Sequence, residues 1–354
     1  MSKISGDQIS NKNKSLFQAP LLVLFLLWLL TCCIAFFALG DAPLRDFDEG
    51  TVARVSFELS QKTGSSRLLP TIWGEPYLNK PPGLHWLIAS FINFTNLFHG
   101  SKQLPSEFII RFLPALFSTF VVPIGGFIQW NLRPGDKSSC IASSGILMSL
   151  LPIARHGRLA MLDGTLLSAM ALFWFLLISI DSKSSNKFRF FLAGLVSSFI
   201  LLLKAPLLIP ISLSALIPML LTHQKWRFSW FKWFSIGLIP GISWHLWHSF
   251  HRGAGALWLW WGDGIGRVVF QTSSGSGQRF LVPFIEVMEG GWPWLLMFPL
   301  GLYIAYQERK EISGRWYMST LIVMSLSILP LKTQYPWYVH PLWLPFALIC
   351  APAL

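Results

Sequence analysis

Residues 20–40 read PLLVLFLLWLLTCCIAFFALG, a nearly unbroken apolar run. A transmembrane helix needs about 20 such residues, whereas the apolar core of a cleaved signal peptide has about 7–15. The run therefore predicts an uncleaved first span. Lys3, Lys12 and Lys14 precede it, and cytoplasmic segments of membrane proteins are enriched in lysine and arginine. Residues 1–18 are accordingly expected to form a cytoplasmic tail.

The composition of the whole chain is that of a membrane protein. Hydrophobic residues make up 53% of the sequence and charged residues only 12%, well below the share in a soluble domain. The 18 Trp and 29 Phe are typical of a lipid-facing surface with aromatic belts at its interfaces. The four cysteines lie in apolar runs and indicate small core residues, neither a disulfide framework nor a metal cluster.

The net charge of +12 raises the question of an anionic partner. No basic run is long enough to follow a nucleic-acid backbone, so nucleic acid is not an expected partner. Membrane lipids, or a substrate lipid that carries phosphate, match this charge better.

Apolar segments recur along the chain and predict an all-α, polytopic transmembrane helical bundle of about ten spans. The segments lie near 19–39, 107–131, 139–154, 162–180, 189–203, 205–221, 230–250, 291–306, 316–331 and 338–354. If each crosses once, alternate connections carry the basic residues and face the cytoplasm, as the positive-inside rule requires. These basic residues are Arg133, Lys137, Lys183, Lys187, Arg189, Lys225, Arg227, Arg309, Lys310 and Arg315.

The segment 84–99 is apolar enough to span, but counting it would turn every later basic loop outward. We therefore expect an interfacial helix along the outer leaflet. The remaining connections then face outside, including a large first loop at 40–106 and a second large loop at 251–290. Loops this long usually carry function. Residues 19–354 as a whole are expected to form a single transmembrane domain.

The first outer loop holds the first candidates for chemistry. Asp48 and Glu49 are adjacent acids close to the first span, where a low dielectric strengthens each charge. Lys80 precedes two prolines that stiffen the backbone, so it could present a fixed cation to a phosphate. The alternative is a solvated turn with ordinary surface charges.

Two further groups have both a structural and a functional interpretation. Arg158 and Asp163 could form an ion pair at a helix end, but charges at membrane depth usually face a cavity, which favours a site. The histidines His245, His248 and His251 have no acidic neighbour, which favours interfacial hydrogen bonding over metal ligation. Lys204, before Ala-Pro, is interpreted as a side chain that snorkels to the outer interface.

Four motifs together resemble the GT-C superfamily of membrane glycosyltransferases, which contains the lipid A aminoarabinose transferases and the protein O-mannosyltransferases. They are Asp48-Glu49 with Gly74-Glu75-Pro76-Tyr77 and Lys80-Pro81-Pro82; Gly157 to Asp163; Trp260 to Arg267 with Trp292-Pro293-Trp294; and Leu331 to Pro341. The topology inferred from charge alone places all four on the outer side. Gly50 to Arg54 departs from the family, which usually has Tyr-Ala-Glu here, and this leaves the sugar open.

The resemblance implies a hexosyl- or pentosyltransferase on the outer face of a bacterial inner or plasma membrane. It would move a sugar, with inversion, from a polyprenyl-phosphate carrier to a lipid A-like or protein acceptor. The implied catalytic residues are Asp48, Glu49 and Asp163, and the implied substrate-binding residues are Lys80, Arg158, Asp263, Arg267, Lys332 and Tyr338. No metal site and no obligatory cofactor are expected, because lysine and arginine can neutralise the leaving phosphate, although a divalent cation remains an open alternative.

Two other functions fit the same spans. A polytopic lipid or solute transporter, or a flippase, would also bury charges in a helical bundle, but it predicts repeats and broken helices near the midplane. The sequence shows no convincing inverted repeat. The other alternative is a catalytically inactive, truncated relative.

Overall fold

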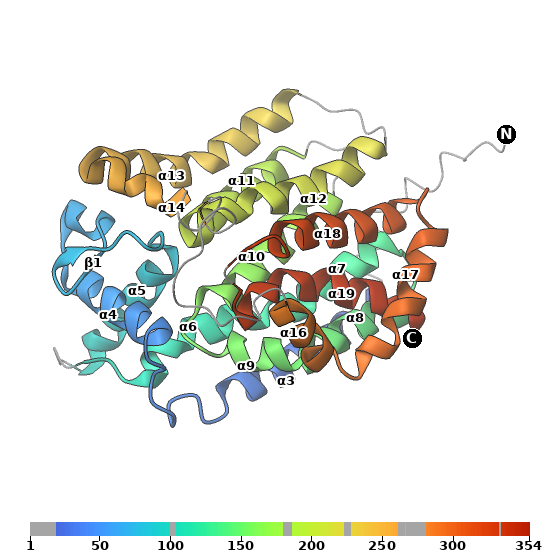
Figure 1. Cartoon of the computed structure of the whole chain (residues 1–354), viewed down its shortest axis with the longest axis horizontal. Helices are drawn as coiled ribbons and strands as arrows, with labels where there is room; N and C mark the ends of the chain where they lie inside the picture. The colour runs from blue at the N-terminus through green and yellow to red at the C-terminus, as the bar shows by residue number, and fades with distance from the viewer. Residues whose placement is uncertain are drawn as a thin grey trace.

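A computed structural model gives the structure of this protein and describes residues 19–99, 104–179, 186–222, 228–260, 266, 281–332 and 334–354. In this part of the chain the fold is a bundle of helices, and the strands form one short hairpin (Figure 1). The expected all-α helical bundle is confirmed at this level.

The helices follow the apolar segments of the sequence closely. In chain order they are α3 (Leu21–Phe36), α4 (Asp48–Gln61), α5 (Gly83–His99), α6 (Glu107–Thr119), α7 (Val121–Leu132), α8 (Lys137–Ser149), α9 (Leu151–Gly157), α10 (Leu162–Ile178), α11 (Lys187–Lys204), α12 (Leu208–Leu221), α13 (Phe228–Arg252), α14 (Trp258–Trp260), α16 (Val282–Gly290), α17 (Phe298–Gln307), α18 (Ile312–Ile328) and α19 (His340–Cys350). Short 3₁₀ turns join several of them, including η2 (Gly64–Leu68), η3 (Ala205–Leu207) and η8 (Pro336–Val339).

The first loop folds into a small substructure at one end of the bundle (left in Figure 1). Helices α4 and α5 pack against each other, and the hairpin of β1 (Thr71–Ile72) and β2 (Glu75–Pro76) packs beside α4. Its turn is fixed by Glu58 of α4, whose carboxylate accepts hydrogen bonds from Thr71 and from the backbone N–H groups of Trp73 and Gly74. The segment predicted as an interfacial helix is thus a helix, α5.

The segment predicted as one span at 139–154 is a bent pair instead. Helices α8 and α9 meet at 54° with Leu150 between them. Pro152 lies in the first turn of α9, where backbone N–H groups have no partner within the helix. The missing N–H of proline therefore costs no hydrogen bond, and α9 can begin in a new direction. At the other end of α9, Gly157 lies against Ser118 of α6 and Gly164 of α10, which is a close approach that only small residues permit.

Contacts between helix ends show which helix ends lie together at each end of the bundle. At one end, Arg133 after α7 pairs with Glu308 after α17, and Arg315 of α18 donates to the carbonyl of Leu221 at the end of α12. At the other end, Lys204 at the end of α11 lies beside Asp163 at the start of α10. The chain therefore reverses direction between α11 and α12, at the break expected near Lys204.

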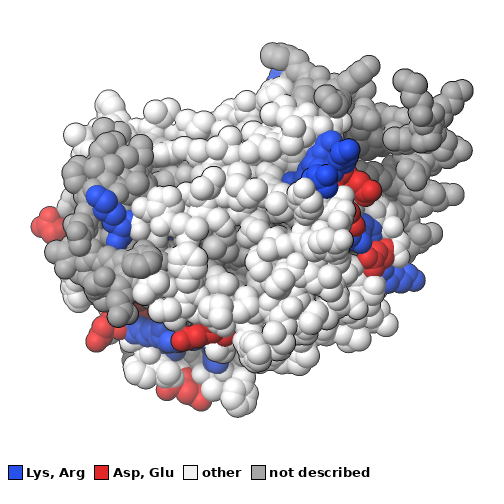
Figure 2. All heavy atoms as spheres, turned by 45° about the vertical axis from the view of Figure 1, so that its right-hand side comes forward, with Lys and Arg blue, Asp and Glu red and all other residues white. Residues whose placement is uncertain are grey.

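The charged side chains also gather toward the two ends of the bundle. Figure 2 shows lysines, arginines and acids grouped toward opposite ends of this face, with a wide uncharged surface between them. By length and composition alone, Glu107–Leu132 and Lys187–Leu221 are long and apolar enough to cross a membrane, and the bent pair α8 and α9 makes a third candidate. Leu21–Phe36, Leu162–Ile178 and Trp294–Gln307 are shorter apolar helices. The number of spans, about ten, stays a prediction.

Candidate active site

A buried ion pair anchors the start of the first loop. The carboxylate of Glu49 has no exposed surface and receives two hydrogen bonds of 2.8 Å from the guanidinium of Arg111 in α6. It also accepts from the backbone N–H groups of Arg45, at 3.0 Å, and Ala160, at 2.8 Å. Burial alone raises the pKa of Glu49, but these bonds outweigh it and hold the pKa below its usual value. Glu49 therefore ties together three distant segments of the chain.

Arg111 completes this anchor on the other side. Its remaining N–H groups donate to the backbone carbonyls of Leu39, Ala42 and Pro43, the residues that lead out of α3. A buried arginine is stable only when its charge and its donors are matched, and here both conditions are met. The pair thus fixes the path of the chain from α3 to Asp48.

Asp48 follows a strained turn. Phe47 has φ 70° and ψ −64°, and the N–H of Asp48 bonds the carbonyl of Asp46 at 2.9 Å, which together form a γ-turn with positive φ. This conformation is uncommon for a residue that has a side chain, and such strain is concentrated at functional sites. The turn leaves the Phe47 ring 82% exposed and makes Asp48 the first residue of α4.

Asp48 shares its surroundings with a second acid and a lysine. Burial raises the pKa of Asp48 above its ordinary range, and the negative charge of Asp163 raises it further. The positive charges of Lys80 and Arg45 act in the opposite direction. Residues that are 115 positions apart in the sequence, Asp48 and Asp163, therefore belong to one electrostatic site.

Asp163 lies beside Lys204, which the sequence predicts to extend to the outer interface. The ammonium Nζ of Lys204 lies 3.6 Å from Oδ1 of Asp163 and 4.5 Å from the centre of the Tyr338 ring. Only 12% of the Lys204 side chain and 10% of the Asp163 side chain are exposed. The interpretation of Lys204 as a snorkelling residue is wrong, because the side chain turns inward to a carboxylate and an aromatic face.

The Lys-Pro-Pro motif, Lys80 to Pro82, directly precedes a close contact between helices α5 and α11. Gly83 begins α5, and a methyl group added there would stand 2.7 Å from the carbonyl oxygen of Leu202 in α11. The Lys80-Pro81-Pro82 segment thus leads into α5 where Gly83 contacts the last turn of α11, which ends in Lys204. The side chain of Lys80 is partly buried.

The other predicted residues lie in different places. Arg158 does not pair with Asp163 but donates to the carbonyl of Phe37 at the end of α3. Lys332 is exposed in the connection that follows α18. Asp263 and Arg267 lie outside the described residues, so the structure says nothing of them.

The histidines of α13 form hydrogen bonds and aromatic contacts. His245 bonds the carbonyl of Leu201 through Nε2 at 3.2 Å and accepts from the indole N–H of Trp260 at 3.3 Å. His248 stacks on Trp244 with ring centres 4.7 Å apart. The interpretation of interfacial hydrogen bonding agrees with His245 and with His251, which bonds the carbonyl of Trp247. It is wrong for His248, which is buried and whose ring nitrogens have no hydrogen-bond partner among the described residues.

Sequence comparison finds relatives along most of the chain, although no family model matches it. The chain is 24% identical over 320 residues to the undecaprenyl phosphate-α-4-amino-4-deoxy-L-arabinose arabinosyl transferase of Enterobacter sp. strain 638, covering 86% of this chain and 54% of that protein. It is 26% identical over 343 residues to a protein of the same name, numbered 2, from Pseudomonas fluorescens strain Pf0-1, covering 89% and 56%. The chain thus spans little more than half the length of these curated relatives.

Solved structures share the fold. The structure of ArnT from Cupriavidus metallidurans bound to undecaprenyl phosphate matches with a TM-score of 0.72 at 16% identity, covering 93% of this chain and 59% of that one. The oligosaccharyltransferase AglB from Archaeoglobus fulgidus matches with a TM-score of 0.54 at 9% identity, covering 93% and 50%. The chain is thus similar in sequence to aminoarabinose transferases along most of its length, and it shares its fold with ArnT and with AglB.

Proposed function

We propose that this protein transfers a sugar from a polyprenyl-phosphate carrier to an acceptor on the outer face of the membrane. The observation that carries the proposal is the grouping of Asp48, Asp163, Lys80 and Lys204 at one end of an apolar bundle. Two acids and two lysines in a partly buried site suit a reaction in which an acceptor attacks and a phosphate leaves. The names of the relatives support an undecaprenyl phosphate-linked sugar as donor.

The proposed reaction is one displacement. An acceptor oxygen forms a bond to the anomeric carbon, the bond from that carbon to the phosphate oxygen breaks, and the carrier leaves as polyprenyl phosphate with the electron pair. Lys80 and Lys204 neutralise the charge that grows on the leaving phosphate, and Tyr338, Arg267 and Lys332 are further candidates for this task. A single displacement inverts the configuration of the sugar.

The acids have different tasks in this proposal. Asp48 orients the acceptor and takes its proton when the acceptor is a hydroxyl group, and a phosphate acceptor needs no base. Asp163 fixes the ammonium of Lys204. Glu49 is a positioning residue, because its two oxygens are already used by Arg111 and by two backbone N–H groups.

We further propose about ten spans in a bacterial inner membrane, with the first loop and Asp48 outside. The lysines of the N-terminal tail and the basic residues at the end of the bundle opposite to Asp163 support this orientation. A transporter is less suitable, because transport sites lie near the midplane of spanning helices, whereas Asp48 and Lys80 belong to the first loop.

The proposal is tested with purified protein in vesicles. Radiolabelled undecaprenyl-phosphate sugars and an extract of bacterial envelope lipids and proteins are added, and labelled products are separated by chromatography. We expect a labelled lipid or protein with the wild type and little product with Asp48→Asn. If the wild type transfers no label from any polyprenyl-phosphate sugar, or if Asp48→Asn transfers as well as the wild type, the proposal is wrong.

A further inference from the structure

Two buried histidines at the Asp163 end of the bundle have no task in the proposed reaction. His340 begins α19 and is 1% exposed, and His156 in α9 is 3% exposed. Their rings meet edge to face with ring centres 5.2 Å apart. His340 follows two residues after Tyr338, whose ring lies against the ammonium of Lys204. An ionisable side chain inside an apolar bundle is costly, so it usually has a function.

The two ring nitrogens of His340 both face backbone carbonyl groups. Nδ1 lies 3.1 Å from the carbonyl oxygen of Trp337, and because a carbonyl can only accept, Nδ1 carries the proton of the neutral ring. Nε2 is then an acceptor. It is buried, it forms no hydrogen bond of normal geometry to the described residues, and the carbonyl of Pro152, a second acceptor, lies near it. A proton on Nε2 would turn this mismatch into a donor and an acceptor, so the surroundings of His340 suit an imidazolium.

Two opposite charges act on His340 from neighbouring helices. Asp163 at the start of α10 favours a proton on the ring, whereas Lys204 at the end of α11 opposes it. His156 is the other ring of the pair, and the positive charges of Arg155 and Arg45 oppose a proton there. Of the two histidines, His340 is therefore the better place for a proton.

The other helices that pack on α19 bring no charge to this end of the bundle. These helices are α7, α8, α17 and α18. The charged residues within them or directly after them lie at the opposite end, and they are Arg133, Lys137, Glu308 and Arg315. The proton on His340 thus depends on the balance between Asp163 and Lys204.

This balance changes when a phosphate binds. Before substrate binds, the negative charges of Asp48 and Asp163 are matched by the positive charges of Lys80 and Lys204. The phosphate of a polyprenyl-phosphate sugar is a diester and adds one negative charge. An unmatched charge in a partly buried site is costly, so a further cation is favoured there.

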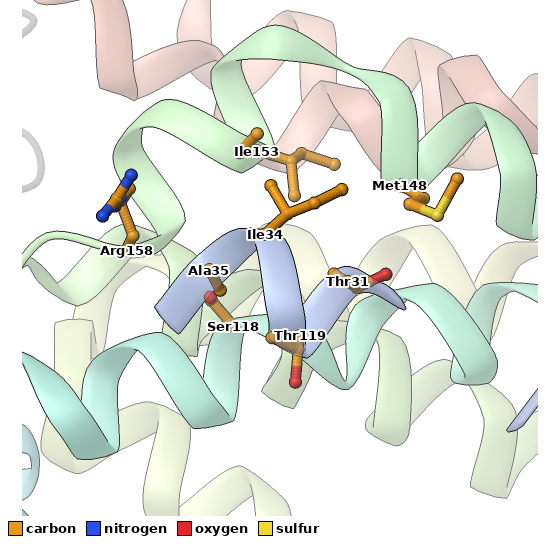
Figure 3. Close-up of a pocket in the computed structure, with 9 residues that line it drawn as sticks. Thr31, Ile34, Ala35, Ser118, Thr119, Met148, Ile153 and Arg158 are labelled. Carbon is orange, nitrogen blue, oxygen red and sulfur yellow. The ribbon is translucent and has the colours of Figure 1, made fainter. Parts of the chain in front are cut away.

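The nearby arginines among the described residues are not placed to supply that cation. Arg111 is matched by Glu49, and Arg45 is exposed, where solvent screens its charge. Figure 3 shows Arg158 at the edge of a small pocket between α3, α6, α8 and α9, and its guanidinium donates to the carbonyl of Phe37. The buried imidazole of His340 can gain the missing charge without any movement of the chain.

We propose that His340 takes up a proton from water when the phosphate of the donor enters the site, so that an imidazolium balances the added negative charge. With a second cation near Asp163, the ammonium of Lys204 can turn toward the phosphate. The proton returns to water when polyprenyl phosphate leaves. The inference rests on the proposed function and makes His340 a positioning residue, because it acts through Asp163 and Lys204 and not on the reacting atoms.

The test measures proton uptake by the purified full chain in detergent. The probe is farnesyl methyl phosphate, a prenyl phosphate diester that has no sugar to transfer and whose charge is constant between pH 6 and 8. Calorimetry in buffers of different ionisation enthalpy counts the protons, and we expect about one proton taken up for each probe bound. The Kd should accordingly rise with pH, by up to about tenfold per pH unit.

Variants locate the proton. His340→Asn keeps an N–H group toward the carbonyl of Trp337 but has no basic nitrogen, so proton uptake and the pH dependence of Kd should both disappear. His251→Asn is the matched control, because Nδ1 of the exposed His251 bonds the carbonyl of Trp247 at 2.9 Å in the same way, and it should behave like the wild type. Asp48→Asn should still take up the proton, which excludes the acid as its site.

The possible results separate this inference from the proposed function. Binding of the probe without proton uptake, or uptake that persists in His340→Asn, would overturn the inference and leave the proposed function intact. If the probe does not bind at any pH, the donor site itself is wrong and both fail. Thermal melts show which variants are folded, and His340→Gln replaces His340→Asn if the latter is not. The measurement on the wild type alone rejects the inference if its Kd is independent of pH.

Discussion

At the scale of single residues, the two adjacent acids of the first loop differ sharply in their surroundings. Glu49 is buried and fully hydrogen bonded, whereas Asp48 is partly buried and has a raised pKa next to Asp163. Adjacent positions at the start of a helix point in different directions, about 100° apart, so one side chain can anchor the loop while the other faces a substrate. This difference leads to two predictions.

The first prediction concerns pH. If Asp48 acts as the base, activity is lost as the pH falls through its pKa, so the acid limb of kcat/KM should lie above the ordinary aspartate pKa of about 3.9. Lys80→Ala should move the limb to higher pH, because a cation that lowers the pKa is gone, and Asp163→Asn should move it to lower pH. Asp48→Asn should lower kcat by about 10²–10⁴-fold and abolish the limb. Shifts in the opposite directions would contradict this role.

The second prediction concerns stability. Glu49→Gln leaves the buried charge of Arg111 without a partner, and such changes cost about 3–5 kcal/mol. The thermal unfolding temperature in detergent should fall strongly, and the double variant Glu49→Gln with Arg111→Met should recover part of the loss. The exposed Glu75 in the same loop offers a matched control, since Glu75→Gln should melt like the wild type. Normal stability of the Glu49→Gln variant would contradict the anchoring role.

At the scale of helices, a close contact holds the start of α5, three residues after Lys80, against the last turn of α11, which ends in Lys204. A methyl group at Gly83 would stand 2.7 Å from a backbone oxygen, and backbone atoms cannot move aside as a flexible side chain can. Gly83→Ala should therefore cost about 1–3 kcal/mol and lower transfer activity, measured by thermal melts and by donor turnover. Gly145→Ala is the control, because among the described residues no atom beyond its chain neighbours and its own helix backbone lies within 4 Å of the added methyl group, and alanine favours a helix interior.

Most helices could be predicted from the sequence, because continuous apolar runs decide them locally. The run at 19–39 became α3, and the break at Lys204 was found where proline follows a charged residue. The bend at Leu150 was missed although Pro152 marks the start of a new helix, because the angle of the bend depends on how α9 packs against α6 and α10. Local pattern gave the helices but not the angles between them.

The site could be predicted only in part, for a similar reason. Asp48, Asp163, Lys80 and Tyr338 were found through motifs, and the structure brings Asp48 near Asp163 and Lys80, and Lys204 near Asp163 and Tyr338. Arg111 was missed because its partner is 62 positions away. The role of Lys204 could have been predicted from the sequence. It is the only charged residue between Phe190 and Thr222, and a lone charge in an apolar run usually has a partner.

At the scale of the whole molecule, charge is divided between the two ends of an apolar body. The leaving group of the proposed reaction can be neutralised by the lysines of one end, so no metal ion is required there. We expect sugar transfer to continue at an unchanged rate after treatment with EDTA. A loss of activity that Mg²⁺ or Mn²⁺ restores would contradict this expectation and would point to Asp48 and Asp163 as ligands.

The last prediction concerns the orientation of the bundle in the membrane. Ser65 is exposed in η2 of the first loop, and Lys310 is exposed at the opposite end, between α17 and α18. Cys33 is itself exposed, so the labelling begins from a variant in which Cys32 and Cys33 are replaced by alanine. In this background, Ser65→Cys should react with a membrane-impermeant maleimide in intact spheroplasts, and Lys310→Cys should react only after lysis.

The physical basis of this expectation is the distribution of arginine and lysine. Arg133, Arg309, Lys310 and Arg315 lie at one end of the bundle, and cations near the ends of spans are retained in the cytoplasm. Each cysteine variant is first tested for the sugar-transfer activity of its parent, so that a protein inserted in the wrong orientation is not included in the labelling result. If Lys310→Cys reacts in intact cells and Ser65→Cys does not, the first loop is cytoplasmic. Asp48 would then meet its substrates on the inner face, and the proposed extracytoplasmic reaction would have to be abandoned.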